Sequence, residues 1–270
     1  MAYRDVRGWM DAVEKMGQLK RVDGADWDLE IGAITEIVSR ENKMRPVLLF
    51  DNIKGHAPGF RVLSGLLNTM PRLALTTGLR ENIEGLDFVR EWRLKMRNMV
   101  PIPPILVNRG PVMENIMEGD DVDLLKFPAP RWHEKDGGRY IGTASVTITQ
   151  DPESDWVNLG TYRVMVHDKN TLGFYISPGK HGRIHREKYH AMGKPCPVAI
   201  SFGHDPLLFV VASLQMPPGI CEYDIVGGIK GEPVEIIKGT VTGLPLPANG
   251  EIVNVLNLEG SASFTPIKKK

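Results

Sequence analysis

The strongest constraint on the fold is a change in the spacing of apolar residues near residue 100. Before that point, apolar residues recur every three or four positions, as at Val6, Trp9 and Val13, which is the period of an amphipathic helix. This spacing predicts helices over residues 4–16, 28–41, 70–79 and 85–98, with short strands at 18–22 and 47–50. We therefore expect a small N-terminal α/β domain at residues 1–99.

Beyond residue 121 the pattern changes to short apolar runs separated by glycine and proline. These runs predict strands at residues 140–149, 162–166, 172–176, 198–202, 207–213, 234–237 and 251–253, with one helix at 182–193. Many short strands are typical of a β-barrel or a β-sandwich, so the predicted class is α+β. The stretch at residues 100–104 is stiff because proline fixes φ, and we interpret residues 100–120 as a linker or arm leading to a domain at 121–270.

The composition excludes several classes of protein. The 33 Lys and Arg residues balance 33 Asp and Glu residues with mixed signs, which argues against nucleic acid as a partner. No apolar run approaches the roughly 20 residues of a membrane span, and the start lacks the apolar region of a signal peptide. Two cysteines, Cys196 and Cys221, are too few for a disulfide framework. We expect a cytoplasmic protein with reduced thiols and a solvated Lys268-Lys269-Lys270 tail.

A candidate site is formed by Asn158, His181 and Glu222, which supply an amide, an imidazole and a carboxylate from three separated segments. Such nitrogen and oxygen ligands suit a hard divalent cation, magnesium or manganese, that also bridges a phosphate. His181 stands where a helix is predicted to begin, and a helix N-terminus favours a phosphate. His185, four residues later, could share the same helix face.

Each of these residues also has a simpler interpretation. Asn158 suits a turn with a local side-chain hydrogen bond. His181 and His185 suit solvated positions, and Glu222 suits a surface salt bridge. Arg163, five residues after Asn158, suits the surface of a strand. Three such residues arise by chance in many chains of 270 residues, so spacing alone leaves both interpretations open.

Four blocks of sequence follow one another in a specific order. They are Arg4-Asp5-Val6-Arg7-Gly8-Trp9 with Gly17-Gln18-Leu19-Lys20-Arg21-Val22 and Asp28-Leu29-Glu30-Ile31; Pro46-Val47-Leu48-Leu49-Phe50-Asp51-Asn52-Ile53-Lys54-Gly55; Trp132-His133 and Asp136-Gly137-Gly138-Arg139-Tyr140-Ile141 leading to Asn158 and Arg163; and Pro218-Gly219-Ile220-Cys221-Glu222-Tyr223-Asp224 through Pro247-Ala248-Asn249-Gly250-Glu251. In these blocks and their spacing, from Tyr3 to about Val253, the chain resembles the UbiD family of decarboxylases, which use prenylated FMN.

The resemblance implies an FMN-binding split β-barrel after the N-terminal domain. It implies a reversible, non-oxidative decarboxylation of a small aromatic or α,β-unsaturated carboxylic acid, with a flavin prenyltransferase as the supplier of the cofactor. Asn158, His181 and Glu222 would hold Mn²⁺ or Mg²⁺ beside the phosphate of the prenylated FMN.

The same resemblance implies roles for further residues. Thr161, Tyr162 and Arg163 would contact the flavin. Arg163 would be the catalytic residue, because its guanidinium can hold a substrate carboxylate in a bidentate manner. The backbone carbonyls of Ala212-Ser213-Leu214 would bind a potassium ion.

One part of the chain departs from the family pattern. Family members continue, soon after the position of Glu251, with a Glu-Gly-Pro-Phe-Gly-Glu segment whose glutamates join the arginine in the catalytic network. Here only Glu259-Gly260 corresponds to it. We therefore expect a barrel that is incomplete at the C-terminus, in a fragment or subunit that is inactive alone and is completed by a homo-oligomer or a partner chain. The alternative is a non-catalytic flavin-binding or scaffold chain.

Overall fold

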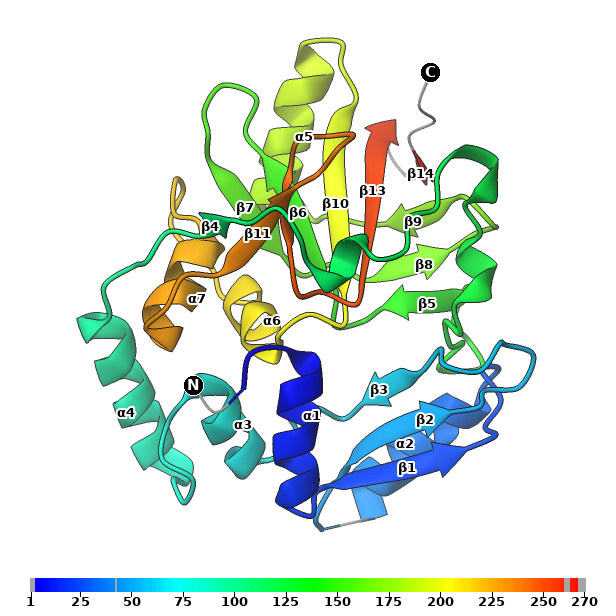
Figure 1. Ribbon diagram of the computed structural model, residues 1–270, viewed down its shortest axis with the longest axis vertical. Coiled ribbons are helices and arrows are strands. Elements are labelled where there is room, and N and C mark those ends of the chain that lie inside the picture. The colour runs from blue at the N-terminus through cyan, green and yellow to red at the C-terminus, as the bar shows by residue number, and fades with distance from the viewer. Residues whose placement is uncertain (1–2, 42, 260–262, 267–270) are drawn as a thin grey trace. The chain divides into compact units, whose positions relative to one another are not determined.

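The computed structural model describes residues 3–41, 43–259 and 263–266, and the chain packs as two compact units. The first unit comprises Met1–Asn98 and Leu124–Ile141, and the second comprises Met99–Asp123 and Gly142–Lys270 (Figure 1). The chain passes between the units at residues 98–99, 123–124 and 141–142, whereas the sequence predicts one linker at residues 100–120. Gly260 and the Lys268-Lys269-Lys270 tail, which the sequence analysis singles out, lie outside the described residues.

The first unit contains a three-stranded sheet with helices packed on it. Its elements are α1 (Val6–Lys15), β1 (Leu19–Asp23), α2 (Glu30–Glu41), β2 (Val47–Asp51), β3 (Val62–Ser64), α3 (Met70–Thr77), α4 (Gly85–Asn98) and the 3-10 turn η3 (Leu124–Lys126). The sheet order is β1-β2-β3, with β1 and β2 parallel and β2 and β3 antiparallel. The helices and strands predicted for this region from the apolar period are confirmed.

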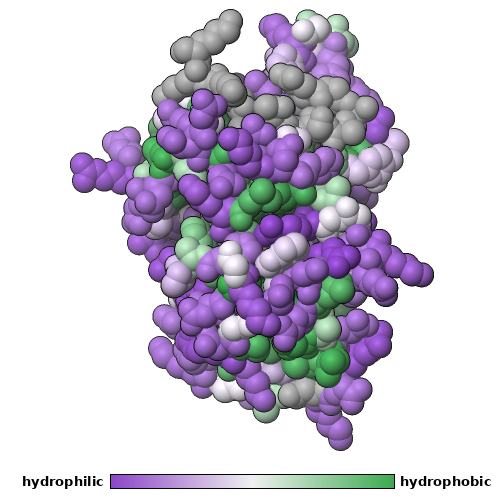
Figure 2. Space-filling model, turned by 90° about the vertical axis from the view of Figure 1, so that its right-hand side faces the viewer, coloured by the Kyte–Doolittle hydropathy of each residue, from purple (hydrophilic) through white to green (hydrophobic). Residues whose placement is uncertain are grey.

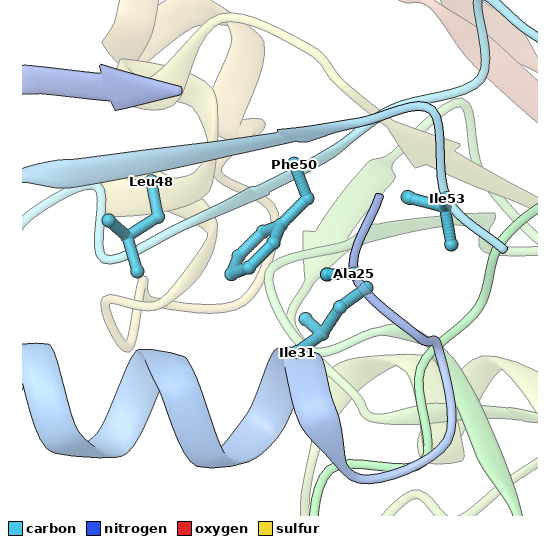
Figure 3. Packing of buried hydrophobic residues seen from close by; sticks show 5 residues of the cluster. All are labelled: Ala25, Ile31, Leu48, Phe50 and Ile53. Carbon is cyan, nitrogen blue, oxygen red and sulfur yellow. The ribbon is translucent and has the colours of Figure 1, made fainter. Parts of the chain in front are cut away.

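Alternate residues of β2 fill a core on each face of this sheet. Leu48 and Phe50 point toward α2, whereas Val47 packs with Trp9 of α1. Five residues form the cluster on the α2 side: Ala25, Ile31, Leu48, Phe50 and Ile53 (Figure 3). Side chains alternate between the faces of a strand, so one continuous apolar run, residues 47–50, is buried on both faces.

This packing predicts the effect of truncating Phe50, which is fully buried. Phe50→Ala is expected to lower the free energy of unfolding by about 3–5 kcal/mol, because the ring leaves a cavity that its neighbours fill only in part. Ile37→Ala on α2 is the control, since Ile37 is 59% exposed and its loss should change stability by only about 0.5 kcal/mol. Urea unfolding followed by circular dichroism measures both, and equal losses would contradict the assigned core.

The second unit is built on an eight-stranded sheet with the order β5-β8-β9-β14-β13-β10-β6-β7. The strands are β5 (Arg139–Gly142), of which only Gly142 belongs to the second unit, β6 (Val146–Gln150), β7 (Val157–Gly160), β8 (Val164–Val166), β9 (Leu172–Phe174), β10 (Cys196–Phe202), β13 (Ile252–Glu259) and β14 (Ser263–Pro266). Within the described part of the chain, no pairing joins the edge strands β5 and β7. The mixed helix and sheet class is thus confirmed, while the split barrel and its incomplete C-terminus stay predictions.

The proline-rich segment is an integral part of the second unit rather than a spacer beside it. It forms β4 (Ile105–Leu106), which pairs in parallel with β11 (Glu235–Lys238), and β11 pairs with β12 (Pro245–Pro247). Ile102 N–H donates to the Asp224 carbonyl of α7 (Glu222–Lys230) over 3.0 Å. A side-chain carbon on Gly227 would lie 2.4 Å from the Ile102 carbonyl oxygen, so glycine allows this close approach. Two 3-10 turns, η1 (Pro111–Met113) and η2 (Gly119–Asp121), complete the segment.

One predicted strand is wrong. Residues 207–212 belong to a helix, α6 (Pro206–Ala212), and Ser213 caps its end, so this run is not an apolar strand. The start of α6 carries a capping signal, because the Asp205 side chain accepts a hydrogen bond from Leu207 N (2.8 Å) and Pro206 occupies the first turn. An apolar run of seven residues is compatible with a buried helix as well as with a strand. The capping hydrogen bond of Asp205 favours the helix.

The surface of the molecule is largely hydrophilic on the face shown in Figure 2, where hydrophobic residues gather in separate patches. None of the helices in the described part of the chain has both the length and the apolar character needed to cross a membrane. Both cysteines are free thiols, as expected, and burial raises the pKa of each to about 12.

Candidate functional site

The candidate site is built on β7, an edge strand of the large sheet. β7 pairs antiparallel with β6, and Asn158 lies directly opposite Thr149. Paired residues point to the same face of a sheet, and both of these side chains are buried there. The helix α5 (His181–Ala191) packs against β6, β7 and β10 (Figure 1). Asn158 is therefore an enclosed strand residue and not a turn residue.

Two histidines stand one turn apart at the start of α5. His185 is fully buried and its Nδ1 lies 3.0 Å from Thr149 Oγ1, so this face of α5 is turned toward the Asn158 side of the sheet. His181 lies on the same helix face and is partly buried. Burial, and then the charge of Lys180, lowers the pKa of His181, which favours the neutral imidazole that binds metals. Burial also lowers the pKa of His185 to about 4.

Glu222 is the first residue of α7 and is only 2% exposed. Its Oε2 accepts a hydrogen bond of 2.8 Å from the backbone N–H of Leu159, the residue after Asn158. The carboxylate therefore lies against β7, and its burial excludes the surface salt bridge considered from the sequence. Burial raises the pKa of Glu222 to about 7, because desolvation disfavours the charged form.

Tyr162 adds a buried hydroxyl beside these residues. A side-chain carbon on Gly160 would lie 2.6 Å from the Tyr162 hydroxyl, and one on Gly182 would lie 3.1 Å from it. The hydroxyl thus lies between β7 and the first turn of α5, where glycine on each side leaves room for it. Its ring stacks on Phe174 with 6.3 Å between the ring centroids. Burial raises the pKa of Tyr162 to about 12, so the hydroxyl stays protonated and can donate a hydrogen bond.

Trp156 contacts this group but is not singled out by the sequence analysis. Its ring lies edge to face with His181, at 4.8 Å and 71°, and with His185, at 4.7 Å and 89°. Its Nε1–H donates to the Ile220 carbonyl oxygen over 3.1 Å. The available signal is its place two residues before Asn158, since residues two apart in an extended segment share a face.

Other predicted site residues are less enclosed. Thr161 is partly buried and Arg163 is exposed, in the segment that joins β7 to β8. The structure therefore places the partly buried Tyr162, but not Arg163, against β7 and the first turn of α5. Residues 212–214 lie at the end of α6, where the Ser213 hydroxyl donates to the Val210 carbonyl oxygen (2.6 Å).

The chemistry of Asn158, His181 and Glu222 fits a hard cation beside an anion. Asn158 Nδ2 is buried and makes no hydrogen bond of standard geometry among the described residues, although the Asn158 side chain lies beside the Tyr162 hydroxyl. A phosphate oxygen would satisfy this amide, and a cation would stabilise the ionised form of Glu222. The described residues contain no group of three or more His, Cys, Asp or Glu side chains that could hold a metal ion, so a site here needs the Asn158 amide as a ligand.

A shallow cleft of about 560 Å³ adjoins the same segments. Its lining includes Trp156, Val157 and Cys221, which immediately precede the Asn158 and Glu222 positions, together with Tyr223 and Ile236. The three candidate ligands are not among the residues that line this cleft. Asn158 and Glu222 are buried, whereas His181 is partly buried.

Two family models match the sequence. The N-terminal domain of 3-octaprenyl-4-hydroxybenzoate carboxy-lyase matches residues 10–91, and the Rift-related domain of the same carboxy-lyase matches residues 105–263. The second match alone covers more than half of the 270 residues and includes the whole candidate site. The chain belongs to the UbiD family.

Proteins named as decarboxylases or as UbiD-class enzymes are similar to this UbiD chain. Pyrrole-2-carboxylic acid decarboxylase of Pseudomonas aeruginosa is 40% identical over 268 residues, which cover 96% of this chain and 53% of that protein. The structure of Sedimentibacter hydroxybenzoicus vanillic acid decarboxylase in closed form matches with a TM-score of 0.91 at 28% identity, over 98% of this chain and 61% of that chain. An evolved dimeric form of the UbiD-class enzyme HmfF from Pelotomaculum thermopropionicum, in complex with prFMN, matches with a TM-score of 0.84 at 25% identity, over 98% and 65%.

This UbiD chain spans about half the length of the curated relatives it matches. The comparison therefore shows the family and the fold of the part present, whereas the activity, the substrate and the partners of the whole protein are matters of proposal. Tyr162, Asn158, His181 and Glu222 all fall within the matched Rift-related domain.

The raised pKa of Glu222 predicts a pH dependence of stability. In the folded chain the Glu222 carboxyl keeps its proton up to about pH 7, whereas in the unfolded chain it loses the proton near its ordinary pKa of 4.5. The unfolded state is thus favoured increasingly as pH rises between these values, and the free energy of unfolding should fall by up to about 3 kcal/mol. Glu222→Gln, which keeps an oxygen acceptor for Leu159 N–H, should remove this fall.

Urea unfolding at a series of pH values, with a chelator present to remove metal ions, measures the effect. Relative to the parent chain, the Glu222→Gln variant should gain stability from pH 4.5 to pH 7 and no further gain should follow above pH 7. The exposed Glu232→Gln serves as the control and should leave the profile unchanged. A parental pH profile in the Glu222→Gln variant would show that the carboxylate is not desolvated.

Proposed function

We propose that this UbiD chain is the flavin- and metal-binding part of a reversible, non-oxidative decarboxylase of aromatic or α,β-unsaturated carboxylic acids. The proposal rests on the buried Asn158 and Glu222, which the Leu159–Glu222 hydrogen bond brings to the same strand, and on His181 at the start of the helix that packs there, in a chain whose relatives are named decarboxylases. Those names favour an enzyme over the non-catalytic scaffold. The acids named for the Pseudomonas and Sedimentibacter proteins are pyrrole-2-carboxylic and vanillic acid, so an aromatic acid is the first substrate class to test.

The proposed cofactor is prenylated FMN, held through Mn²⁺ or Mg²⁺ on Asn158, His181 and Glu222. When bound, this flavin supplies the covalent chemistry, while the protein supplies binding, orientation and electrostatics. Two kinds of donor suit its phosphate: the buried Nδ2 amide of Asn158 and the N–H groups in the first turn of α5. The split β-barrel around the flavin is part of the same proposal.

The neighbouring residues receive proposed roles that follow from their chemistry. Thr161 and the neutral hydroxyl of Tyr162 donate hydrogen bonds to the flavin. Arg163 holds the substrate carboxylate, a role that suits a guanidinium because it can bind a carboxylate with two hydrogen bonds. A potassium ion on the carbonyls of residues 212–214 would add positive charge beside the phosphate. A flavin prenyltransferase supplies the cofactor, and a homo-oligomer or a partner chain completes the enzyme.

Binding of FMN and Mn²⁺ tests the proposed site without any need for turnover. We expect the 1–270 chain to bind FMN more tightly when Mn²⁺ is present, as measured by quenching of flavin fluorescence. His181→Ala and Asn158→Leu should each weaken this Mn²⁺-dependent binding, because each removes one ligand of the cation. The expected loss is about 10–100-fold.

His190→Ala is the matched control for the histidine, since His190 lies on the same helix and is exposed. It should leave FMN binding unchanged, and circular dichroism should show all variants folded. Equal affinity of the parent chain and the His181→Ala chain would count against the metal site, as would FMN binding that ignores Mn²⁺.

Decarboxylation is expected to need the family's Glu-Gly-Pro-Phe-Gly-Glu segment, which residues 1–270 do not contain. Loss of a general acid typically costs about 10²–10⁴ in rate. With prenylated FMN and Mn²⁺, residues 1–270 should therefore release no carbon dioxide from pyrrole-2-carboxylate or vanillate. Residues 1–253 fused to the remaining part of the Pseudomonas relative should release it. Turnover by residues 1–270 alone would refute the need for that segment, and a flavin-loaded but inactive fusion would refute the decarboxylase.

A further inference from the structure

Trp156 links the three segments of the proposed cation site, although it supplies no ligand itself. Its ring lies edge to face with His181, with 4.8 Å between the ring centroids. Its Nε1–H donates over 3.1 Å to the carbonyl oxygen of Ile220, two residues before Glu222. In the sequence it stands two residues before Asn158. One side chain therefore contacts or adjoins all the elements that carry the candidate ligands.

His185 provides the fixed side of this arrangement. It is fully buried, its ring meets Trp156 at 4.7 Å and 89°, and its Nδ1 lies 3.0 Å from Thr149 Oγ1. The backbone of Trp156 is held as well, because Asp151 N–H donates to the Trp156 carbonyl oxygen over 2.9 Å. The position of the indole is thus fixed by contacts on the β6 side, and the His181 ring packs edge to face against it.

The loop before Glu222 depends on the same side chain. Residues 213–220 are exposed apart from Met216, so packing contributes little to their placement. The hydrogen bond from Trp156 to Ile220 attaches this loop to the β7 segment just before the chain enters α7 at Glu222. The position of the Glu222 carboxylate therefore depends both on its own bond to Leu159 and on this attachment.

We infer that Trp156 is a positioning residue for the proposed cation site, which fixes the ring of His181 and the entry to Glu222 relative to Asn158. The inference rests on the proposed function, because it assigns Trp156 a part in binding the cation. Contacts that orient metal ligands typically change metal affinity by about 10–100-fold when they are removed. A residue with a packing role alone would lower stability without acting through His181.

The test compares Trp156 variants of the 1–270 chain, with Mn²⁺ and FMN as the probes and free Mn²⁺ measured by electron paramagnetic resonance. Trp156→Leu removes both the aromatic contact and the donor, and should weaken Mn²⁺ binding in the presence of FMN by about 10–100-fold. Trp156→Phe keeps an aromatic ring against the histidines but loses the bond to Ile220, and should weaken it by about a few-fold. Trp92→Leu, on α4 of the first unit, is the matched control and should bind as the parent does.

A double-mutant cycle separates positioning from packing. Residues that act through one another give non-additive effects. The loss caused by Trp156→Leu should therefore be several-fold smaller in a His181→Ala chain than in the parent. Thermal unfolding of each variant shows whether the change in affinity goes beyond a change in stability.

Other results would overturn either the inference about Trp156 alone or the proposed function as well. Parental Mn²⁺ affinity in a folded Trp156→Leu chain overturns the inference and leaves the proposed function standing. Additive losses in the double variant assign Trp156 to packing and also overturn it. A parent chain that binds neither Mn²⁺ nor FMN removes the proposed function and the inference together. If Trp156→Leu does not fold, unchanged affinity in Trp156→Phe overturns the inference.

Discussion

The hydrogen bond from the Leu159 amide to the buried Glu222 carboxylate joins parts of the site that lie 63 residues apart in the sequence. β7 is an edge strand, and an edge strand presents N–H groups that no neighbouring strand pairs. Glu222 satisfies one of these groups, and α7 packs against β7 at the same place. The interaction that completes the sheet edge therefore also brings a carboxylate next to Asn158.

The position of Glu222 depends in turn on the segment that carries the prolines. α7 is held by backbone contacts from this segment, in which the carbonyl oxygens of Val100 and Ile102 approach Gly228 and Gly227 more closely than any side-chain carbon would allow. The parallel pairing of Ile105 with Glu235 extends the same contact. The stiff proline-rich segment and the glycines of α7 together position this helix. The segment at residues 100–120, which the sequence predicts to be a linker or arm, therefore has a structural role.

Local patterns in the sequence predict local structure well. The apolar period of residues 4–16 and 28–41 gives α1 and α2, because amphipathic spacing reflects burial of one helix face. The same reasoning fails for residues 207–213, where an apolar run has no period and the Asp205 cap decides for a helix. It also misses α7 and the β4–β11 pairing, because these depend on contacts between residues far apart in the sequence.

The candidate site was predicted only in part for the same physical reason. The family resemblance singles out Asn158, His181 and Glu222, because their spacing alone leaves simpler interpretations open. Trp156 and the buried state of His185 could not be read from sequence, because both follow from α5 packing across β6 and β7. For Arg163, the residue type suggests a partner for a carboxylate. Its exposure, however, cannot be predicted from the neighbouring sequence.

Burial of Glu222 has opposite consequences for the empty and the occupied site. Without a cation, desolvation favours the protonated acid, and the pKa of about 7 expresses an energetic cost to the folded chain. A cation that binds there must take the place of that proton, and it then interacts with the carboxylate in surroundings that screen charge poorly. The buried amide of Asn158, which has the Tyr162 hydroxyl beside it but no hydrogen bond of standard geometry, would likewise be better satisfied by an added acceptor. The fold therefore maintains, through packing elsewhere, a polar group that is unfavourable alone. In the proposed site a cation and an anion would offset this cost, and near pH 7 binding of the cation would release a proton.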